Sequence, residues 1–143
     1  MKDYLQELVD QSRTTTEAGL MVREYLQARV LEALQQAGAF ESWALLGGTA
    51  LRFLYRLPRF SEDLDFSRTE INLSYDVIKH EFQRFVERIQ STFEAEVYAV
   101  DIRTRPDAVV QSASIGFPGL LHELGLSPHT RQKLSIKVED TDE

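Results

Sequence analysis

The chain has 143 residues, of which 43% are hydrophobic and 27% charged, and this apolar share is enough for the core of one compact domain. A formal net charge of -7 argues against a protein that coats nucleic acid, because such coats need Lys and Arg over much of their surface, and the lack of cysteine removes disulfides and thiolate metal sites. No segment approaches the ~20 apolar residues of a membrane span and no secretory signal opens the chain, so we expect a cytoplasmic protein without a membrane anchor.

Charged residues are unevenly distributed along the sequence. The pair Asp63 and Asp65 is bracketed by basic residues, namely Arg52, Arg56, Arg59 and Arg68. Acidic residues crowd the last five positions, namely Glu139, Asp140, Asp142 and Glu143. We therefore expect basic side chains near any site built on the aspartate pair, and a mobile acidic tail.

The first part of the chain predicts two helices. Residues from about Asp3 to Arg13 indicate a short helix, and Thr14 followed three positions later by Glu17 is the capping-box pattern that begins a second one. Apolar residues then recur at steps of three and four up to Gly38, which would end the helix. They are Val22, Leu26, Val30, Ala33, Leu34 and Ala37. This stripe predicts a helix that faces the core.

A glycine pair comes after the next apolar run. Trp43 to Leu46 is short and apolar, typical of a buried strand, and Thr49 to Tyr55 predicts a short helix. Between them, Gly47 and Gly48 leave the first helical N–H groups free to bind a phosphate, and Thr49 adds a hydroxyl. A Gly-Gly pair alone is more often a tight turn, so a phosphate site needs support from other residues.

A pair of aspartates in a strand pattern provides that support. Asp63 and Asp65 alternate with Leu64 and Phe66, which places both carboxylates on one face, roughly 6–7 Å apart along the chain. This spacing suits Mg²⁺ (or Mn²⁺), because Mg²⁺ is usually held by one or two carboxylates together with substrate phosphates. A solvated strand face would be the better explanation of an isolated Asp-x-Asp pair. Here the pair comes after a strand, two glycines and a helix, which favours a site.

The second half predicts one long helix and three strands. Ser74 is a helix N-cap, and an apolar stripe from Ile78 to Phe93 follows it. Residues 98–103 and 108–117 predict two strands around a turn at Arg105-Pro106-Asp107. Residues 134–139 alternate as a last strand, in which Lys137 and Glu139 share the polar face. The three histidines lack metal-ligand spacing, so we expect them at the surface; they are His80, His122 and His129.

The motif Gly47-Gly48-Thr49-Ala50-Leu51, followed by Arg59-x-Ser61-x-Asp63-Leu64-Asp65-Phe66, resembles the AbiEii/MenT-type toxins of the DNA polymerase β-like nucleotidyltransferase superfamily. The resemblance implies an α/β (α+β) fold, a small mixed sheet flanked by helices. It also implies a toxin of a toxin–antitoxin or abortive-infection system, with a cognate antitoxin. The implied reaction transfers a nucleoside monophosphate from an NTP, in some members to the acceptor end of tRNA.

The same resemblance implies roles for individual residues. Asp63 and Asp65 would hold the metal, and the residues that would bind the nucleotide are Gly47, Gly48, Thr49, Arg59 and Ser61. Lys137 and Glu139 are similar to the family's next motif, in which a lysine approaches the phosphates and an acidic residue completes the carboxylate set. An exposed Lys/Glu pair on an edge strand explains the same residues equally well. Asp101 competes with Glu139 as the third carboxylate.

The resemblance extends from about Leu31 to Glu139. We expect one nucleotidyltransferase core domain over residues 1–143, with N-terminal helices in 3–38 and the catalytic sheet and helices in 43–139, and without the helical C-terminal half of family members. Apolar surface left by that half could be covered in a homodimer. The main hypothesis is a metal-dependent enzyme that acts on an RNA or protein hydroxyl. The alternatives are a non-catalytic nucleotide- or partner-binding module, and a small-molecule nucleotidyltransferase of the aminoglycoside type.

Overall fold

The computed structural model describes residues 2–46, 63–69, 73–105 and 110–141. In chain order the elements are α1 (Lys2–Gln11), α2 (Thr15–Gln36), the short 3₁₀ helix η1 (Ala39–Glu41), β1 (Trp43–Leu46), β2 (Asp63–Arg68), α4 (Tyr75–Ala95), β3 (Asp101–Arg105), β4 (Gln111–Pro118), α5 (Leu120–Glu123) and β5 (Lys133–Thr141). The helix expected at Thr49 to Tyr55 and the turn residues 106 and 107 lie outside the described residues. Among the described helices, none has the length and apolar character that crossing a bilayer requires.

The long helices begin and end where the sequence predicts. The Thr14 hydroxyl accepts a hydrogen bond of 3.0 Å from the Glu17 N–H, which caps α2. Gly38 follows the last turn with a φ of 83°, a left-handed conformation that suits glycine. The Ser74 hydroxyl caps α4 in the same way as Thr14, accepting from the N–H of Val77 at 3.3 Å. Local capping chemistry therefore sets these boundaries.

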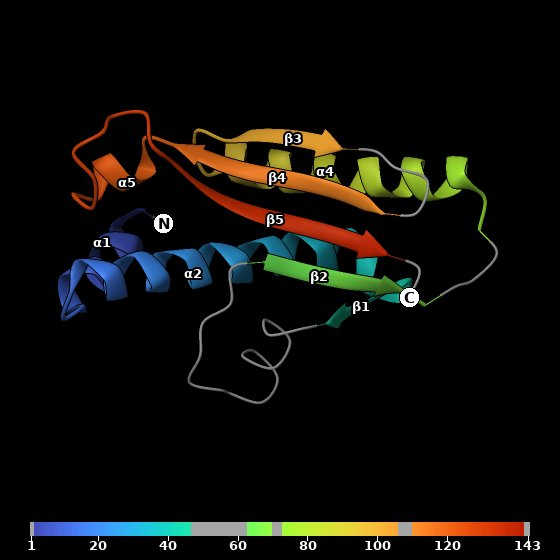
Figure 1. Ribbon diagram of the computed structural model, residues 1–143, viewed down its shortest axis with the longest axis horizontal. Coiled ribbons are helices and arrows are strands. Elements are labelled where there is room, and N and C mark those ends of the chain that lie inside the picture. Colours follow the sequence, from blue (N-terminus) through green and yellow to red (C-terminus); the bar gives the residue numbers. More distant parts are fainter. Residues whose placement is uncertain (1, 47–62, 70–72, 106–109, 142–143) are drawn as a thin grey trace.

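The described strands form one five-stranded sheet in the order β1-β2-β5-β4-β3 (Figure 1). The pair β2–β5 is parallel, whereas β1–β2, β5–β4 and β4–β3 are antiparallel, so the predicted mixed sheet is confirmed. Parallel strands need a long connection, and here the chain between β2 and β5 contains α4, β3, β4 and α5. Two segments about 70 residues apart in the sequence thereby become neighbours.

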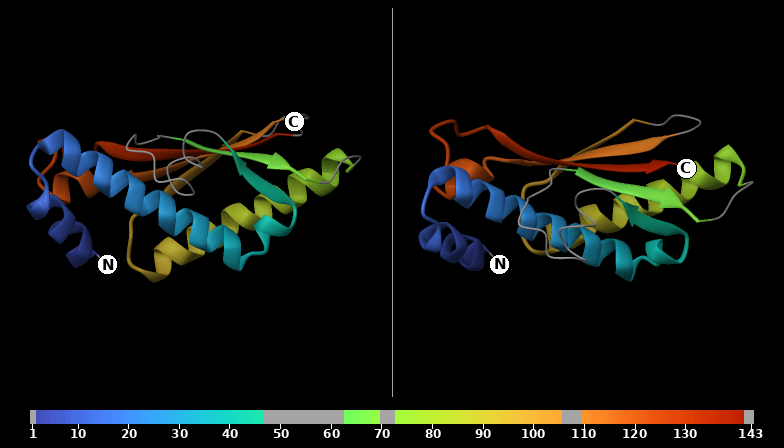
Figure 2. Two further views of the ribbon diagram at one scale, coloured as in Figure 1. Left: turned by 90° about the horizontal axis from the view of Figure 1, so that it is seen from below. Right: turned by 60° about the horizontal axis from the view of Figure 1, so that its bottom comes forward.

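Sheet and helices form two layers (Figure 2). Helices α2 and α4 cover one face of the sheet, and the core lies between them and the inward side chains of the strands. Trp43 occupies its β1 end, with ring centroids 5.0 Å from Phe66 and 4.8 Å from Phe85. Trp43 is buried in the core, as expected for the first residue of this apolar run. The other face of the sheet carries alternate, mostly polar side chains and is the face seen in Figure 1.

Two strand predictions need correction. The strand at Trp43–Leu46 was expected to be buried, but Ala44 and Leu46 are exposed because β1 ends the described sheet and only one of its faces meets the helices. The strand expected from residue 98 begins at Asp101 instead. Val97 has a φ of 65°, which is not a strand conformation, and Tyr98 packs edge-on against Phe93 in the core. These residues therefore do not pair with β4 as part of the sheet.

Candidate functional site

The open face of the sheet brings together four of the described residues that the sequence marked for chemistry, namely Asp63, Asp65, Lys137 and Glu139. Asp63 lies opposite Lys137 in the β2–β5 register, and Asp65 lies opposite Glu139. Residues at alternate positions of a strand share a face, and their buried neighbours, such as Leu64 and Val138, point to the helices. Strand pairing therefore gathers three carboxylates and one ammonium group on two adjacent strands.

The electrostatics of this group are those of crowded carboxylates. Partial burial raises the pKa of Asp65, and the negative charges of Glu139 and Asp63 raise it further. The Lys137 ammonium donates to a Glu139 carboxylate oxygen at 2.6 Å, and this hydrogen bond raises the pKa of Lys137. One lysine thus balances part of the negative charge, and a bound cation would relieve the remainder.

The alternative interpretation of Lys137 and Glu139 as a pair on an edge strand is wrong. Strand β5 lies in the middle of the sheet, between β2 and β4. Asp101, the other candidate for a third carboxylate, lies on β3, three strands away from β2. There it accepts a hydrogen bond of 2.5 Å from the Lys133 ammonium, which lowers its pKa.

Arg68 and Asp140 do not lie where their place in the sequence suggested. The arginine was expected beside the aspartate pair and the aspartate in a mobile tail, but both are buried on the helix-covered face, with side chains 3% and 1% exposed. Their closest atoms, Arg68 Nη1 and Asp140 Oδ2, are 3.1 Å apart. Arg68 is three positions after Asp65, and Asp140 is one position after Glu139. Because side chains alternate between the two faces of a strand, an odd separation places each of them on the face opposite to the site. The pair ties β2 to β5 from behind the site.

Basic and hydroxyl side chains continue the open face beyond β5. A groove of about 390 Å³ is lined by Arg103, Thr104, Arg105, Ser112, Ala113, Ser114 and Lys137. Register places five of these residues, together with the three carboxylates, in two rows that cross the sheet: Arg103, Ser114, Lys137 and Asp63 form one, and Arg105, Ser112, Glu139 and Asp65 form the other. The sequence analysis missed the four β3 and β4 residues, because alternation marks their face but cannot say which strand lies beside which.

The donor chemistry of the site fits a hard divalent cation. Asp63, Asp65 and Glu139 offer only oxygen atoms, which Mg²⁺ prefers, and crowding of their charges favours a bound cation. Within the described ranges no three acidic or histidine side chains are gathered closely enough to hold a metal by themselves. A Mg²⁺ site does not require this, since substrate phosphates usually supply the other ligands.

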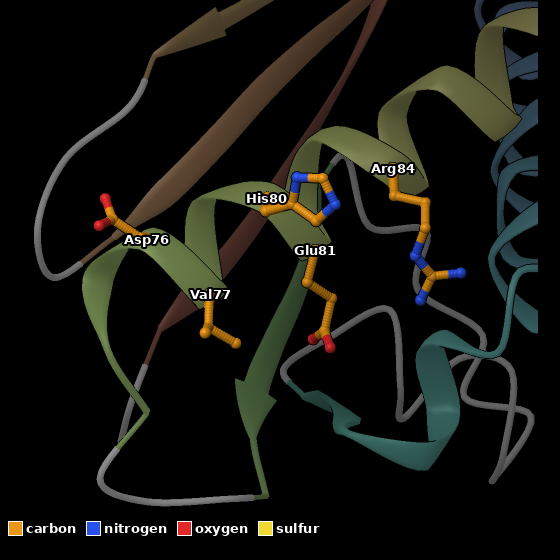
Figure 3. A pocket seen from close by; sticks show the side chains of 5 residues that line it. All are labelled: Asp76, Val77, His80, Glu81 and Arg84. Carbon is orange, nitrogen blue, oxygen red and sulfur yellow. The ribbon is translucent and has the colours of Figure 1, made fainter.

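A second hollow lies on α4 and does not include Asp63, Asp65 or Glu139 (Figure 3). Its lining is Asp76, Val77, His80, Glu81 and Arg84. Glu81 accepts a hydrogen bond of 3.0 Å from the Ser42 hydroxyl, and Arg84 donates to the carbonyl of Ala37 at 3.1 Å. These contacts tie α4 to the chain around η1, so Glu81 and Arg84 have a structural role. His80 is exposed, as expected, and so are His122 and His129.

The nucleotide-binding segment expected from the sequence is outside the described part of the chain. This concerns Gly47, Gly48, Thr49, Arg59 and Ser61. The described strand that precedes it, β1, ends at Leu46, the register partner of Asp65. The segment therefore continues the chain directly after a residue that lies beside the carboxylates.

Comparison with known proteins gives matches to one family and one fold. Residues 29–141 match the family model of the AbiEii nucleotidyl transferase toxin of type IV toxin–antitoxin systems. The crystal structure of JHP933 from Helicobacter pylori matches with a TM-score of 0.55 and 22% identity, over 86% of this chain and 44% of that one. A "putative nucleotidyltransferase" from H. pylori matches with a TM-score of 0.54 and 22% identity, over 85% and 44%. The chain thus spans less than half the length of these solved proteins. No curated protein sequence matches it.

Proposed function

The chain belongs to the AbiEii family of nucleotidyl transferase toxins of type IV toxin–antitoxin systems, and from this membership we propose that it transfers a nucleoside monophosphate from an NTP to a hydroxyl group. The family implies a nucleotide substrate and a cognate antitoxin, and its members typically use a divalent metal. We further propose that the acceptor is an RNA or protein hydroxyl. The observation that supports nucleotidyl transfer is that Asp63, Asp65 and Glu139 lie together on the open face of the sheet.

Each side chain has a distinct part in the proposed reaction. Asp63 and Asp65 would hold Mg²⁺, which neutralises charge on the phosphates when it is bound. Glu139 is the better third carboxylate, because it faces Asp65 whereas Asp101 is three strands away and engaged by Lys133. The Lys137 ammonium, a compact cation, would approach the triphosphate.

The bond changes balance without a further reactant. The acceptor oxygen forms a bond to the α-phosphorus of the NTP, the bond to the bridging oxygen breaks, and pyrophosphate leaves. Glu139 would accept the proton of the acceptor hydroxyl and pass it to solvent. In this chemistry positioning and charge neutralisation supply most of the rate. By the family resemblance Gly47, Gly48, Thr49, Arg59 and Ser61 bind the nucleotide, with Gly48 and Thr49 at the triphosphate.

Titration with each NTP, with and without Mg²⁺, tests the proposal. The wild type should bind at least one NTP in a metal-dependent manner, and an Asp63→Asn/Asp65→Asn double variant should lose this binding while it keeps its fold by circular dichroism. Asp101→Asn is the matched control, since it removes an aspartate from the same face outside the site. Undiminished binding by the double variant would overturn the assignment. Binding without transfer of a labelled nucleotide to RNA or protein would identify a non-catalytic module.

A further inference from the structure

A line of buried polar side chains crosses the sheet behind the carboxylates of the open face. Arg68 of β2, Asp140 of β5 and Gln111 of β4 are all buried, and register places Gln111 opposite Asp140. Charged groups lose favourable hydration when they are buried, and an apolar pair of similar volume is often at least as stable in such a position. Core stability therefore does not explain why Arg68 and Asp140 are charged.

The apolar pattern of β2 and β5 does not select one register of these strands. On both strands alternate side chains are buried against the helices, and they include Leu64, Phe66, Ile136 and Val138. A slip of one residue would turn one strand's buried side chains to the other face, but a slip of two would keep them all inward. It would, however, move Asp65 about 6.6 Å along β5, away from its place opposite Glu139.

The buried ion pair does distinguish these registers. Arg68 Nη1 lies 3.1 Å from Asp140 Oδ2, and it donates a hydrogen bond of 3.4 Å to the carbonyl oxygen of Asp140. One guanidinium group thus contacts both the side chain and the backbone of a single residue on the neighbouring strand. A slip of two residues would move these groups apart and leave a carboxylate in the core without this cation, which is strongly unfavourable.

From these contacts we propose that Arg68 and Asp140 are positioning residues for the site on the open face. Their ion pair holds β2 and β5 in the register in which Asp65 lies opposite Glu139. The inference rests on the proposed function, in which Asp65 binds the metal and Glu139 accepts a proton. Neither Arg68 nor Asp140 would touch the reactants, because both side chains are on the helix-covered face. They act through the backbone of the two strands.

Disulfide trapping measures the register without metal or nucleotide. The chain has no cysteine, so two introduced thiols have no competing partner within it. Ser67→Cys/Thr141→Cys joins register partners, whose Cα atoms are about 5 Å apart on neighbouring strands. Ser67→Cys/Glu139→Cys reports a slip of two residues, because its Cα atoms are roughly 8 Å apart in the native register, too far for a disulfide. Without further substitutions only the first pair should cross-link.

The register is then compared with the transfer rate in Arg68→Met/Asp140→Leu. This apolar variant should remain folded, because it leaves neither charge of the pair in the core. It should cross-link the slipped pair at least about tenfold faster than the parent does, since it lacks the buried pair that opposes the slip. Its single-turnover transfer rate should fall about 10²-fold, because a misplacement of about 1 Å can cost that much. Lys133→Met/Asp101→Leu is the matched control, since it removes an exposed ion pair from the same sheet and should change both rates by less than about threefold.

The inference is overturned if the apolar variant keeps the native cross-link and the wild-type rate, or if it loses rate without a change of register. Asp140→Asn, which keeps the shape of the side chain and removes its charge, should also give the slipped cross-link, and it serves if the apolar variant does not fold. Arg68→Lys, which keeps a cation beside Asp140, should retain the native cross-link and most of the rate. Failure of the proposed function is seen separately, because a wild type that binds no NTP would still show which cross-link forms.

Discussion

Asp65 of β2 lies directly opposite Glu139 of β5 in the parallel pair at the centre of the sheet. Two carboxylates in this relation repel each other, and the pKa of Asp65 is raised by its burial, by Glu139 and by Asp63. The metal-free protein therefore has a destabilising concentration of negative charge at its proposed site. Such conflict between function and stability is common at sites that bind a charged ligand.

Replacing Asp65 by Asn should stabilise the metal-free protein. The substitution removes the cost of burying a charge and the repulsion from Glu139. Because the side chain is only partly buried and solvent screens its charge, the gain should be at most about 1 kcal/mol, a rise in Tm of up to about 4 °C. Thermal unfolding in the presence of EDTA measures it.

The same pair predicts a pH dependence. A raised pKa in the folded state means that protonated Asp65 contributes to stability, and this contribution is lost as the pH rises through the folded-state pKa. The gain from Asp65→Asn should thus be largest at neutral pH and vanish under acidic conditions. A variant less stable than the wild type at neutral pH would contradict this account.

Glu139→Gln should reduce transfer far more than Asp101→Asn does. Glu139 faces the aspartate pair, and loss of a general base typically costs about 10²–10⁴-fold in rate. Asp101 accepts its hydrogen bond from Lys133 at the edge of the described sheet, so its removal should change the rate by less than about threefold. Single-turnover rates with labelled NTP compare the two. Equal effects of the two substitutions would contradict the assignment of Glu139, rather than Asp101, as the third carboxylate.

The buried ion pair behind the site should be sensitive to removal of one partner. Arg68→Met leaves the carboxylate of Asp140 in the core without this cation, and breaking a buried pair costs about 3–5 kcal/mol. Urea unfolding should show this loss, and a second substitution, Asp140→Leu, should recover most of it. Arg103→Met, at an exposed arginine, should change stability by less than about 0.5 kcal/mol. Equal losses in the Arg68 and Arg103 variants would show that the buried pair is not needed.

Tyr98 predicts a loss of stability in alkali. Burial raises the pKa of its hydroxyl from 10.0 to about 12, and the nearby Tyr25 adds to the shift. The folded state therefore keeps the proton, and the stability that this provides is present below pH 10 and is lost as the pH rises towards 12. Tyrosinate absorbance should show a late-ionising component, to which Tyr25 also contributes because burial raises its pKa, and this component should become smaller in Tyr98→Phe. Unfolding of that variant should depend less on pH in this range. An unchanged late phase would assign it to another tyrosine.

Much of the molecule could be predicted from local patterns. Helix starts at Thr14 and Ser74 depend on a hydroxyl that bonds an N–H three residues later, which is visible in the sequence. The shared face of Asp63 and Asp65 follows from the two-residue period of a strand. The family could also be predicted from the sequence, since the motif around these aspartates lies within the matched residues 29–141.

Only the tertiary structure decided which strands are neighbours. Parallel pairing of β2 with β5 joins residues 63–67 to 137–141, and hydrogen bonds between backbones carry no local sequence signal. That pairing placed Glu139 beside Asp65, left Asp101 three strands away and turned Arg68 and Asp140 towards each other in the core. The sequence by itself determined the chemistry of each strand face, and the order of strands determined which of those faces act together.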